Sequence, residues 1–363
     1  MFIVDAHLDL AYSALSFDRD LRQSVAILRG REPLKGHPVG GQVTVAVPDL
    51  IEAGVGLVWS TLYSTPHTVV SRQLGERLIY RNGEEAHRLA QKQLDYYHRL
   101  ADEDSRVRLV TDGQGLNDVL SSHGVTAGPV ASEEKLLGLF ILMEGADPVR
   151  APEEIPMWHE RGVRAIGPAW HTTRYAPGAG YDDGAPLPAE GVALLEMMAE
   201  WGMILDISHM GERAALTALE IYGGQVVATH SNARKLLGGS RRHLADEQIR
   251  LLAERGGVMG VVLYNKFLKV GYRLGDGKHM VGVAEVVAQI DYVCQLLGTA
   301  EHVAIGTDFD GGFGALDIPA EVDGPVDLIK IGAGLQARGY DEGDIGLIMG
   351  GNWVRVLQKC LGS

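Results

Sequence analysis

Residues 136–145 read LLGLFILMEG, an apolar run that ends on the acidic residue Glu144. A strand with one face in water alternates apolar and polar residues, whereas a strand buried on both faces is apolar throughout. The run is therefore predicted to be a buried strand of a parallel sheet. A carboxylate at the end of such a strand is costly without a partner, so the ends of the other apolar runs need the same inspection.

Short apolar runs with polar ends recur along the whole chain. The other seven lie at 2–9, 54–63, 163–171, 202–209, 225–231, 256–265 and 302–311, and helix-period segments lie at 190–201, 212–222, 246–256 and 283–298. Strands that alternate with helices pair in parallel through right-handed crossovers. The pattern predicts a single α/β domain over residues 1–363, a (β/α)₈ TIM barrel with insertions in its βα loops.

Two segments hold most of the length beyond a minimal barrel. A charged, helix-like stretch occupies residues 72–104, after the second predicted strand. A Gly/Pro-rich stretch occupies residues 172–191, after the fourth strand, where a βα loop belongs. Because βα loops line the active-site face of this fold, the second segment is expected to cover the mouth of the barrel.

The composition limits the classes of partner. A hydrophobic fraction of 46% with 22% charged residues is typical of a soluble globular protein, and the net charge of −14 argues against nucleic acid, whose phosphates would be repelled. No apolar run reaches the ~18 residues of a membrane span, and no leader pattern precedes the first strand. Cys294 and Cys360 provide neither a disulfide framework nor a cysteine-based zinc site. We expect a cytoplasmic protein with no membrane partner.

Ionisable residues stand at the ends of several predicted strands. They are His7 and Asp9 in VDAHLDL (4–10), Glu144, His209, His230, and Asp308 and Asp310 in GTDFDGG (306–312). Each alone has an ordinary explanation: a hydrogen-bonded histidine, a capping aspartate or a surface glutamate. However, the carboxyl ends of barrel strands meet at one active site. Carboxylates and imidazoles gathered there predict a site for Zn²⁺ or a similar cation, bound by His7, Asp9, Glu144, His209 and His230.

At these residues the chain resembles a known family. The motifs are VDAHLDL, GVGLVWSTLY, LMEGAD, DISHM, THSNAR, SRRH, GTDFDGG and GGNWVRVL, spread almost from end to end. Together they resemble the renal (membrane) dipeptidase-like enzymes, the M19 peptidases of the amidohydrolase superfamily. The resemblance implies a binuclear site with two Zn²⁺ per chain, other divalent metals being possible. His7 and Asp9 would bind one ion, His209 and His230 the other, and Glu144 would bridge them.

The resemblance also implies roles for residues that are not ligands. Asp308 matches the acid that exchanges a proton with the attacking water, and Arg242 matches the residue that binds the substrate carboxylate. One additional residue between THS and SRR leaves Arg241 as an alternative to Arg242. The segment GPAWHTT places Trp170 in strict register where the family often has a catalytic histidine, with His171 beside it. A one-residue shift reverses the face of a strand; we take His171 as catalytic and Trp170 as the alternative.

The implied reaction is hydrolysis of small dipeptides, L-Xaa-L-Xaa or L-Xaa-D-Xaa, by a hydroxide that bridges two metal ions. A deacylase of N-acyl amino acids, a lactonase or a deaminase could use the same scaffold, but a simple lactone offers Arg242 no carboxylate. A barrel that only binds metal or a partner would be expected to lack a ligand or the proton-carrying acid. The resemblance further implies a homodimer. The tail LQKCLGS (357–363) lacks the hydrophobic segment of a lipid-anchor signal.

Overall fold

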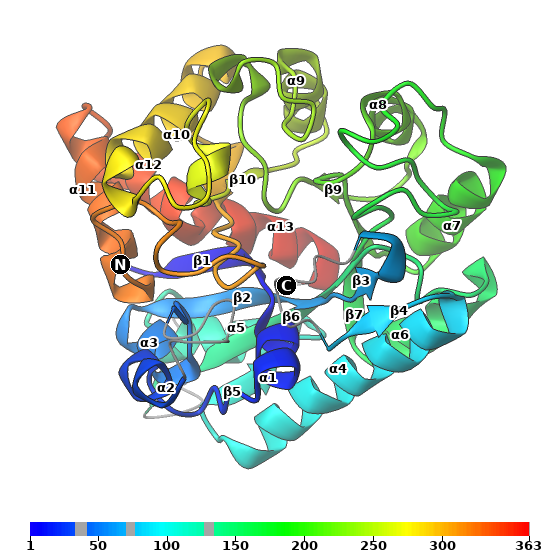
Figure 1. Ribbon diagram of the computed structural model, residues 1–363, viewed down its shortest axis with the longest axis horizontal. Coiled ribbons are helices and arrows are strands. Elements are labelled where there is room, and N and C mark those ends of the chain that lie inside the picture. Colours follow the sequence, from blue (N-terminus) through cyan, green and yellow to red (C-terminus); the bar gives the residue numbers. More distant parts are fainter. Residues whose placement is uncertain (33–41, 70–76, 127–133, 363) are drawn as a thin grey trace.

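The computed structural model describes residues 1–32, 42–69, 77–126 and 134–362 as a mixed α/β structure with a central parallel sheet. Helices surround the strands, as Figure 1 shows. The helices are α1 (Leu10–Phe17), α2 (Val25–Arg31), α3 (Val47–Glu52), α4 (Gly83–Glu103), α5 (Gly113–Ser122), α6 (Ile155–Glu160), α7 (Ala189–Glu200), α8 (Glu212–Ile221), α9 (Asp246–Glu254), α10 (Val283–Leu297), α11 (Ile329–Ala337), α12 (Glu342–Gly346) and α13 (Asn352–Leu361). None of these described helices has the length and apolar character needed to cross a membrane.

Within the described residues, the strands form one large parallel sheet and two small ones. The large sheet runs β1 (Ile3–Leu8), β2 (Val55–Leu62), β6 (Leu137–Glu144), β7 (Val163–Gly167), β8 (Ile204–Asp206) and β9 (Val226–Val227), and β5 (Val107–Leu109) also pairs with β6. The small sheets pair β10 (Met259–Val261) with β11 (Val303–Ile305), and β3 (Thr65–Pro66) with β4 (Ile79–Tyr80). The predicted strands are thus present, in parallel and in the expected order.

Strand β6 shows why its sequence is apolar on both faces. Its eight residues are all buried, and alternate side chains enter two different apolar clusters. Leu139 and Ile141 pack in the larger cluster beneath the surrounding helices, whereas Phe140 packs in a second cluster with Trp59 of β2 and Trp353 of α13. The Trp59 ring lies 4.6 Å from Phe140 and 5.2 Å from Trp353 between centroids. Helix α13 therefore completes the second cluster against the sheet.

Of the predicted barrel, the described residues show a parallel sheet curled as a half-barrel, with β10 and β11 as a separate pair. Near β9 the contact is the parallel bridge of Ala228 with Met259, and the amide of Ser231 also donates to the carbonyl of Gly260 at 2.7 Å. Near β1 the amide of Asp308 donates to the carbonyl of His7 at 3.1 Å. The neighbouring amide of Thr307 donates instead to the side chain of Asp5, at 2.8 Å. Because a carboxylate takes the amide that would otherwise pair with a strand, the regular ladder stops there.

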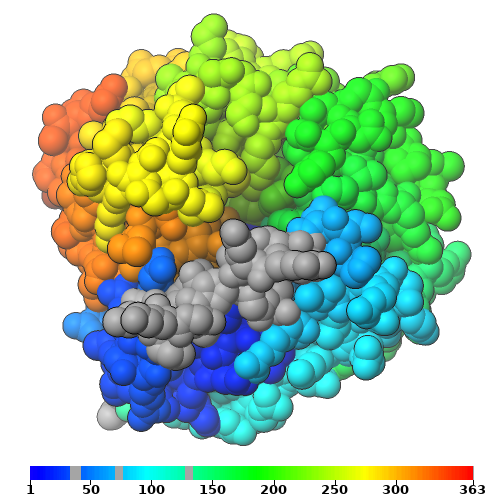
Figure 2. Space-filling model, in the orientation of Figure 1, coloured from blue at the N-terminus to red at the C-terminus, as the bar shows by residue number. Residues whose placement is uncertain are grey.

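Segments far apart in sequence meet on this face. The blue N-terminal part lies beside the orange part near the C-terminus in Figures 1 and 2, in agreement with the hydrogen bond between His7 and Asp308. Gly260 of β10 and Gly306 after β11 allow an equally close approach to Thr229. A Cβ at these glycines would lie 1.9 Å and 1.8 Å from the carbonyl oxygen of Thr229. Only glycine permits this contact.

The predicted insertions are also located. The charged stretch at 72–104 contains α4, whose first turn is capped by Asn82 accepting from the amide of Glu85 at 2.9 Å; residues 72–76 lie outside the described part. The Gly/Pro-rich stretch at 172–191 is mainly turns and bends before α7. Both therefore follow the strands after which they were expected.

Candidate active site

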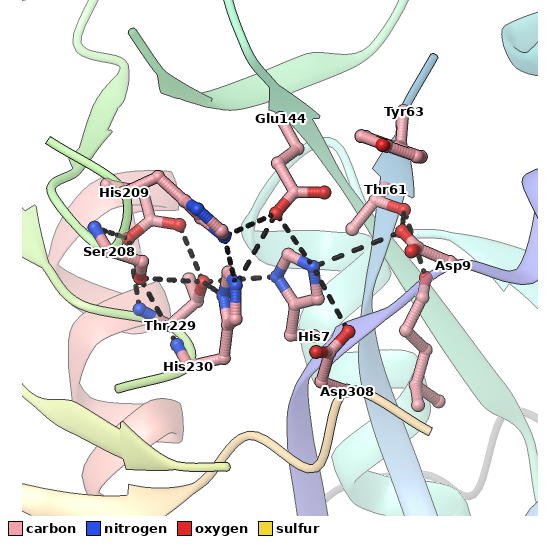
Figure 3. Close-up of polar contacts among 12 residues, drawn as sticks. His7, Asp9, Thr61, Tyr63, Glu144, Ser208, His209, Thr229, His230 and Asp308 are labelled. Carbon is pink, nitrogen blue, oxygen red and sulfur yellow. Dashed lines mark hydrogen bonds and ion pairs between the residues drawn. The ribbon is translucent and has the colours of Figure 1, made fainter. Parts of the chain in front are cut away.

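The strand ends bring the predicted ligands together. His7 lies in β1 and Asp9 directly after it, and Glu144 is the last residue of β6. His209, His230 and Asp308 each follow their strands β8, β9 and β11 by three residues. Because the carboxyl ends of these parallel strands lie on the same side of the sheet, the six side chains point toward one another, as Figure 3 shows.

One carboxylate oxygen lies at the centre of the cluster. Oε1 of Glu144 is 3.4 Å from Nε2 of His7, 3.1 Å from Nε2 of His209 and 3.4 Å from Nε2 of His230. Nε2 of His7 is also 4.0 Å from Oδ1 of both Asp9 and Asp308. The cluster therefore extends from two histidines on one side of Glu144 to two aspartates on the other, with His7 between them.

These residues fit a divalent cation. Two overlapping sets, His7–Glu144–His230 and His7–Asp9–Asp308, each have their ligand atoms within 4.8 Å of one another. Nε2 of His7 is buried and has no hydrogen-bond partner among the described residues. A buried polar nitrogen without a partner is rare in a folded protein, and one surrounded by carboxylate oxygens is suited to bind a cation. Imidazole nitrogen and carboxylate oxygen are the donors that Zn²⁺ accepts.

The charges in the cluster support the same interpretation. Burial alone would lower the pKa of His7, but the carboxylates of Glu144, Asp308 and Asp9 raise that pKa to about 10. Burial, with Arg242 nearby, lowers the pKa of His209 to about 4, and burial with His7 nearby also lowers the pKa of His230. His209 and His230 are therefore neutral at physiological pH, which is the form that binds a metal ion.

The two aspartates experience a strongly negative environment. Burial raises the pKa of Asp9, and the Glu144 carboxylate raises it further. Burial likewise raises the pKa of Asp308 well above its usual range, with Asp9 and Glu144 adding to the effect and His7 opposing it. Carboxylates packed this closely favour any added positive charge. A cation bound here would let all of them ionise.

Asp308 is held in an uncommon backbone conformation. Its φ is +61°, in the left-handed region that non-glycine residues rarely adopt. A Cβ at Gly311 would lie only 1.8 Å from Oδ1 of Asp308, so the carboxylate occupies the space that a larger residue 311 would need. The second acid of this motif, Asp310, lies elsewhere: it contacts Arg19 at 3.3 Å and accepts from the Thr44 hydroxyl at 2.8 Å.

A cavity of about 550 Å³ opens onto the cluster. Its lining includes Asp9, Glu144, His209, His230 and Asp308 together with aromatic residues, among them Tyr63, Trp170, Tyr264 and Phe267. Ala179, Gly180 and Tyr181 from the 172–191 segment line it as well, as expected for a loop at the mouth. This volume lies in the range of small-molecule sites.

For the predicted residues that are not metal ligands, the structure shows which of two adjacent residues lines the cavity. Arg242 lines the cavity, whereas the Arg241 side chain is 60% exposed and lies 3.7 Å from Asp183. Trp170 lines the cavity too. His171 borders a small adjacent pocket instead, and its ring lies 4.1 Å from that of Tyr181. A catalytic role for His171 stays a prediction, and the described structure does not bring it to the main cavity.

Several residues that support the ligands were not singled out from the sequence. The carboxylate of Asp206 accepts hydrogen bonds from Thr229 and Ser208. Thr229 in turn contacts His7 and His230. Asp206 and Thr229 are the first residues of the motifs DISHM and THSNAR. Their polar character within apolar strands was the available signal.

Comparisons with other proteins show which family this chain is similar to. The sequence model of the family described as membrane dipeptidase (peptidase family M19) matches residues 1–361. An uncharacterized protein in the pqqA 5′ region of Klebsiella pneumoniae is 33% identical over 236 residues, which cover 62% of this chain and 83% of that protein.

Solved structures share the fold. The crystal structure of dipeptidase AC, a metallopeptidase of family M19, has a TM-score of 0.80 at 24% identity and covers 100% of this chain and 99% of its own. A metallopeptidase from Rhodobacter sphaeroides, liganded with a phosphinate mimic of the dipeptide L-Ala-D-Ala, has a TM-score of 0.79 at 23% identity, with 99% of each chain covered. With the family match extending over nearly its whole length, the chain belongs to the membrane dipeptidase family, peptidase family M19, and is a metallo-dipeptidase of that family.

Proposed function

We propose that this chain hydrolyses dipeptides with two Zn²⁺ ions bound per chain. His7 and Asp9 would hold one ion, His209 and His230 the other, and Glu144 both. The observation that carries the proposal is the position of Glu144 Oε1, within 3.4 Å of three histidine Nε2 atoms from three different strands. A single carboxylate in that position can neutralise part of the charge on two adjacent cations.

Asp308 is the proposed proton carrier. Two zinc ions at such a site lower the pKa of bound water and so supply hydroxide near neutral pH. Asp308 would accept the proton of the attacking water and donate it to the leaving amine, as general base and then general acid. In the metal-free protein burial raises the pKa of this carboxyl group, and cations bound beside it would lower that pKa again, so that the carboxylate is free to accept a proton. It also lies beside the ligands, 4.0 Å from Nε2 of His7.

Arg242 is the proposed partner of the substrate's terminal carboxylate. Its guanidinium donates to the carbonyls of Ser208 at 2.8 Å and His230 at 3.2 Å, and contacts Nε2 of His209 at 3.0 Å. A guanidinium has five N–H donors, and the contact with Nε2 of His209 would be given up when that nitrogen binds a metal ion. The two bonds to carbonyls then leave three donors that can bind a carboxylate. The same contacts hold the arginine within reach of the ligands, which favours a scissile bond one residue from the carboxylate.

The wall of the cavity supports a short substrate. Tyr181 and Gly180 of the 172–191 segment line it together with the strand-end residues, so we expect a third residue to meet this loop. The Rhodobacter relative binds a mimic of L-Ala-D-Ala. We therefore propose L-Xaa-L-Xaa and L-Xaa-D-Xaa dipeptides as substrates, with His171 retained as a candidate for polarising the scissile carbonyl.

The test uses zinc-loaded protein with matched substrates. A free dipeptide should be hydrolysed much faster than the same dipeptide with an amidated C-terminus, and faster than the tripeptide extended by one residue. Arg242→Met should weaken binding of the free acid and shrink the preference over the amide. Equal hydrolysis of amidated and free dipeptides by the unmodified protein would refute the Arg242 role. Rapid hydrolysis of N-acyl amino acids instead would favour a deacylase.

Three further proposals concern the closure of the barrel, the oligomeric state and the cellular location. We propose that the strands close into one (β/α)₈ barrel domain, supported by the Ala228–Met259 bridge and the His7–Asp308 hydrogen bond at its two seams. We also propose a homodimer in the cytoplasm. The free thiols of Cys294 and Cys360 are compatible with a reducing compartment. Light scattering at micromolar concentration should give twice the chain mass; a monomer would refute the dimer.

A further inference from the structure

The hydroxyl of Thr229 contacts both groups of proposed ligands. Its Oγ1 lies 3.2 Å from Nδ1 of His7 and 3.0 Å from Nδ1 of His230. It also lies 2.6 Å from Oδ2 of Asp206. In Figure 3 it is placed beside His230, behind the ring atoms that face Glu144. One hydroxyl group therefore lies against the far side of two histidine rings.

The direction of each hydrogen bond follows from the donors around Asp206. Oδ1 of Asp206 accepts from the amides of Ser208 and Thr229, both at 3.0 Å, and from the Ser208 hydroxyl at 2.6 Å. Its Oδ2 then accepts the short bond from the Thr229 hydroxyl. A carboxylate only accepts, and a bond of this length is typical of a charge-assisted O–H donor. The single proton of Thr229 is therefore directed at Asp206.

With its proton used, the Thr229 oxygen can only accept from the two rings. The Ser208 hydroxyl is 3.3 Å away, but it donates to Asp206 and accepts from the amide of His230 at 3.2 Å. The two lone pairs of Thr229 are then filled by Nδ1–H of His7 and Nδ1–H of His230. Each ring thus carries a proton on Nδ1, which leaves Nε2, the atom that faces Glu144, as the metal-binding nitrogen.

We propose that Thr229 is a positioning residue that fixes the tautomer of one histidine ligand at each of the two metal ions, with Asp206 fixing the direction of its proton. The inference rests on the proposed binuclear site. In structural terms, one histidine ligand of each proposed ion would donate to the same Thr229 hydroxyl, in addition to the proposed contact of both ions with the Glu144 carboxylate. A substitution of Thr229 should therefore lower the affinity for both zinc ions.

The backbone keeps this hydroxyl in place. The Thr229 amide is bound to Asp206, and its carbonyl oxygen fits between Gly260 and Gly306, where any Cβ would approach within 2 Å. The hydroxyl consequently has little freedom to turn toward another partner. Such support behind a histidine ligand commonly changes metal affinity by about 10-fold to 100-fold.

Three variants separate the role in metal binding from a role in stability. Thr229→Val preserves the shape but removes the hydroxyl, so zinc affinity, measured by competition with a chelator, should fall about 10-fold to 100-fold at both ions. Thr229→Ser restores a hydroxyl and should recover most of that affinity. Ser208→Ala removes a hydroxyl from the same carboxylate without touching either ring. It should lower the melting temperature and cost clearly less zinc affinity than Thr229→Val, because both ring hydrogen bonds stay in place.

Reversing the hydrogen bonds gives a sharper test. In Asp206→Asn, three donors hold the amide oxygen at the Oδ1 position, so the NH₂ group must face Thr229. Thr229 would then accept from the asparagine and direct its proton at a ring, which would have to carry its own proton on Nε2. This variant should lose affinity for one zinc ion at least as severely as Thr229→Val.

The tautomers can be read directly in the unmodified protein. Long-range ¹H–¹⁵N spectra of zinc-loaded protein with labelled histidine should show a protonated Nδ1 and a metal-bound Nε2 for His7 and His230. A protonated Nε2 on either ring would overturn the inference, as would a Thr229→Val variant that binds both ions normally or loses only one. Unmodified protein that binds no zinc would refute the proposed function instead, while the His230 tautomer would still test the Thr229 contact.

Discussion

Gly311 offers a way to move the Asp308 carboxylate without changing it. A Cβ at residue 311 would lie 1.8 Å from Oδ1 of Asp308 and 2.9 Å from its carbonyl oxygen. Carbon and oxygen atoms that are not bonded approach to about 3.3 Å, so Gly311→Ala requires the carboxylate to move by about 1.5 Å. Rotation of the side chain relieves the clash with the carboxylate, whereas the carbonyl oxygen is part of the backbone and must itself move by about 0.4 Å, which adds a cost to folding.

The expected effect on catalysis is large. A misplacement of about 1 Å in a catalytic group can cost about 10²-fold in rate, or about 2.7 kcal/mol in the activation free energy. We therefore expect Gly311→Ala to lower kcat/KM for a dipeptide by about two orders of magnitude, with a small fall in the melting temperature from the backbone shift.

Gly312→Ala is the matched control, because it adds the same methyl group one residue later in the cavity lining. Gly312 has a φ of +84° and no atom within 4 Å of its Cβ position. Alanine there costs about 1–2 kcal/mol of backbone strain, a shift of about 1–3 °C for a chain of 363 residues. Its kcat/KM should stay close to that of the unmodified enzyme.

A double variant decides whether Gly311 acts through Asp308. If it does, Gly311→Ala combined with Asp308→Asn should be no slower than Asp308→Asn alone, because the second change removes the group that the first displaces. Losses that multiply would refute this reasoning, as would unchanged kcat/KM in Gly311→Ala. Equal losses in the two alanine variants would show that an added methyl group simply obstructs the cavity.

The remaining predictions concern the metal ions and the proton. Elemental analysis after reloading with zinc should show that Glu144→Ala loses both zinc ions, whereas His230→Ala loses mainly one. If each variant lost a single ion, Glu144 would not bridge the two ions. Asp308→Asn should keep both ions and lose more than about 10²-fold in kcat; near-normal turnover would assign the proton transfer elsewhere. With a chelator present, the pKa of His7 is raised to about 10, so its proton stabilises the fold fully below about pH 6.5 and this stabilisation is lost as the pH rises through about 10. Zinc must displace the His7 proton, so the affinity of the protein for zinc should rise with pH over this range. Proton release should make the calorimetric heat of zinc binding at pH 7 depend on the ionisation enthalpy of the buffer. Equal heats in different buffers would contradict it.

The sequence predicts the strand ends of this fold well, for a physical reason. Strands such as β6 are buried on both faces, so an ionisable residue at the end of the apolar run is conspicuous. The same reasoning located the other candidates. His7 is the second-last residue of β1, and His209, His230 and Asp308 each lie three residues after the end of a strand. Helices α7 to α10 were recognised from their periodicity to within two residues at each end.

Other features depend on contacts that the order of residues does not reveal. Whether Trp170 or His171 faces the cavity is decided by the backbone after β7 ends at Gly167, and here Trp170 lines it. Arg241 and Arg242 are adjacent and chemically identical, and only the turn between η3 (Arg234–Leu237) and α9 separates them. Periodicity predicts parallel strands and their order, but it carries no information about side chains that replace backbone partners, so it does not reveal how regular the pairing is between neighbouring strands.

Those side chains connect the incomplete pairing of the sheet with its chemistry. Asp5 accepts the amide of Thr307 at 2.8 Å and that of His7 at 3.3 Å, at the seam where β1 meets β11. Asp206 accepts the amide of Thr229 at 3.0 Å, where the pairing of β8 with β9 ends. A carboxylate that takes these amides ends the regular ladder and turns the next residues inward, and those residues include His7, His230 and Asp308. The ligands therefore converge where main-chain pairing of β1 with β11 and of β8 with β9 gives way to pairing with buried carboxylates. A variant that restores an uninterrupted ladder at either place should gain sheet hydrogen bonds only by turning ligands away from the metal site.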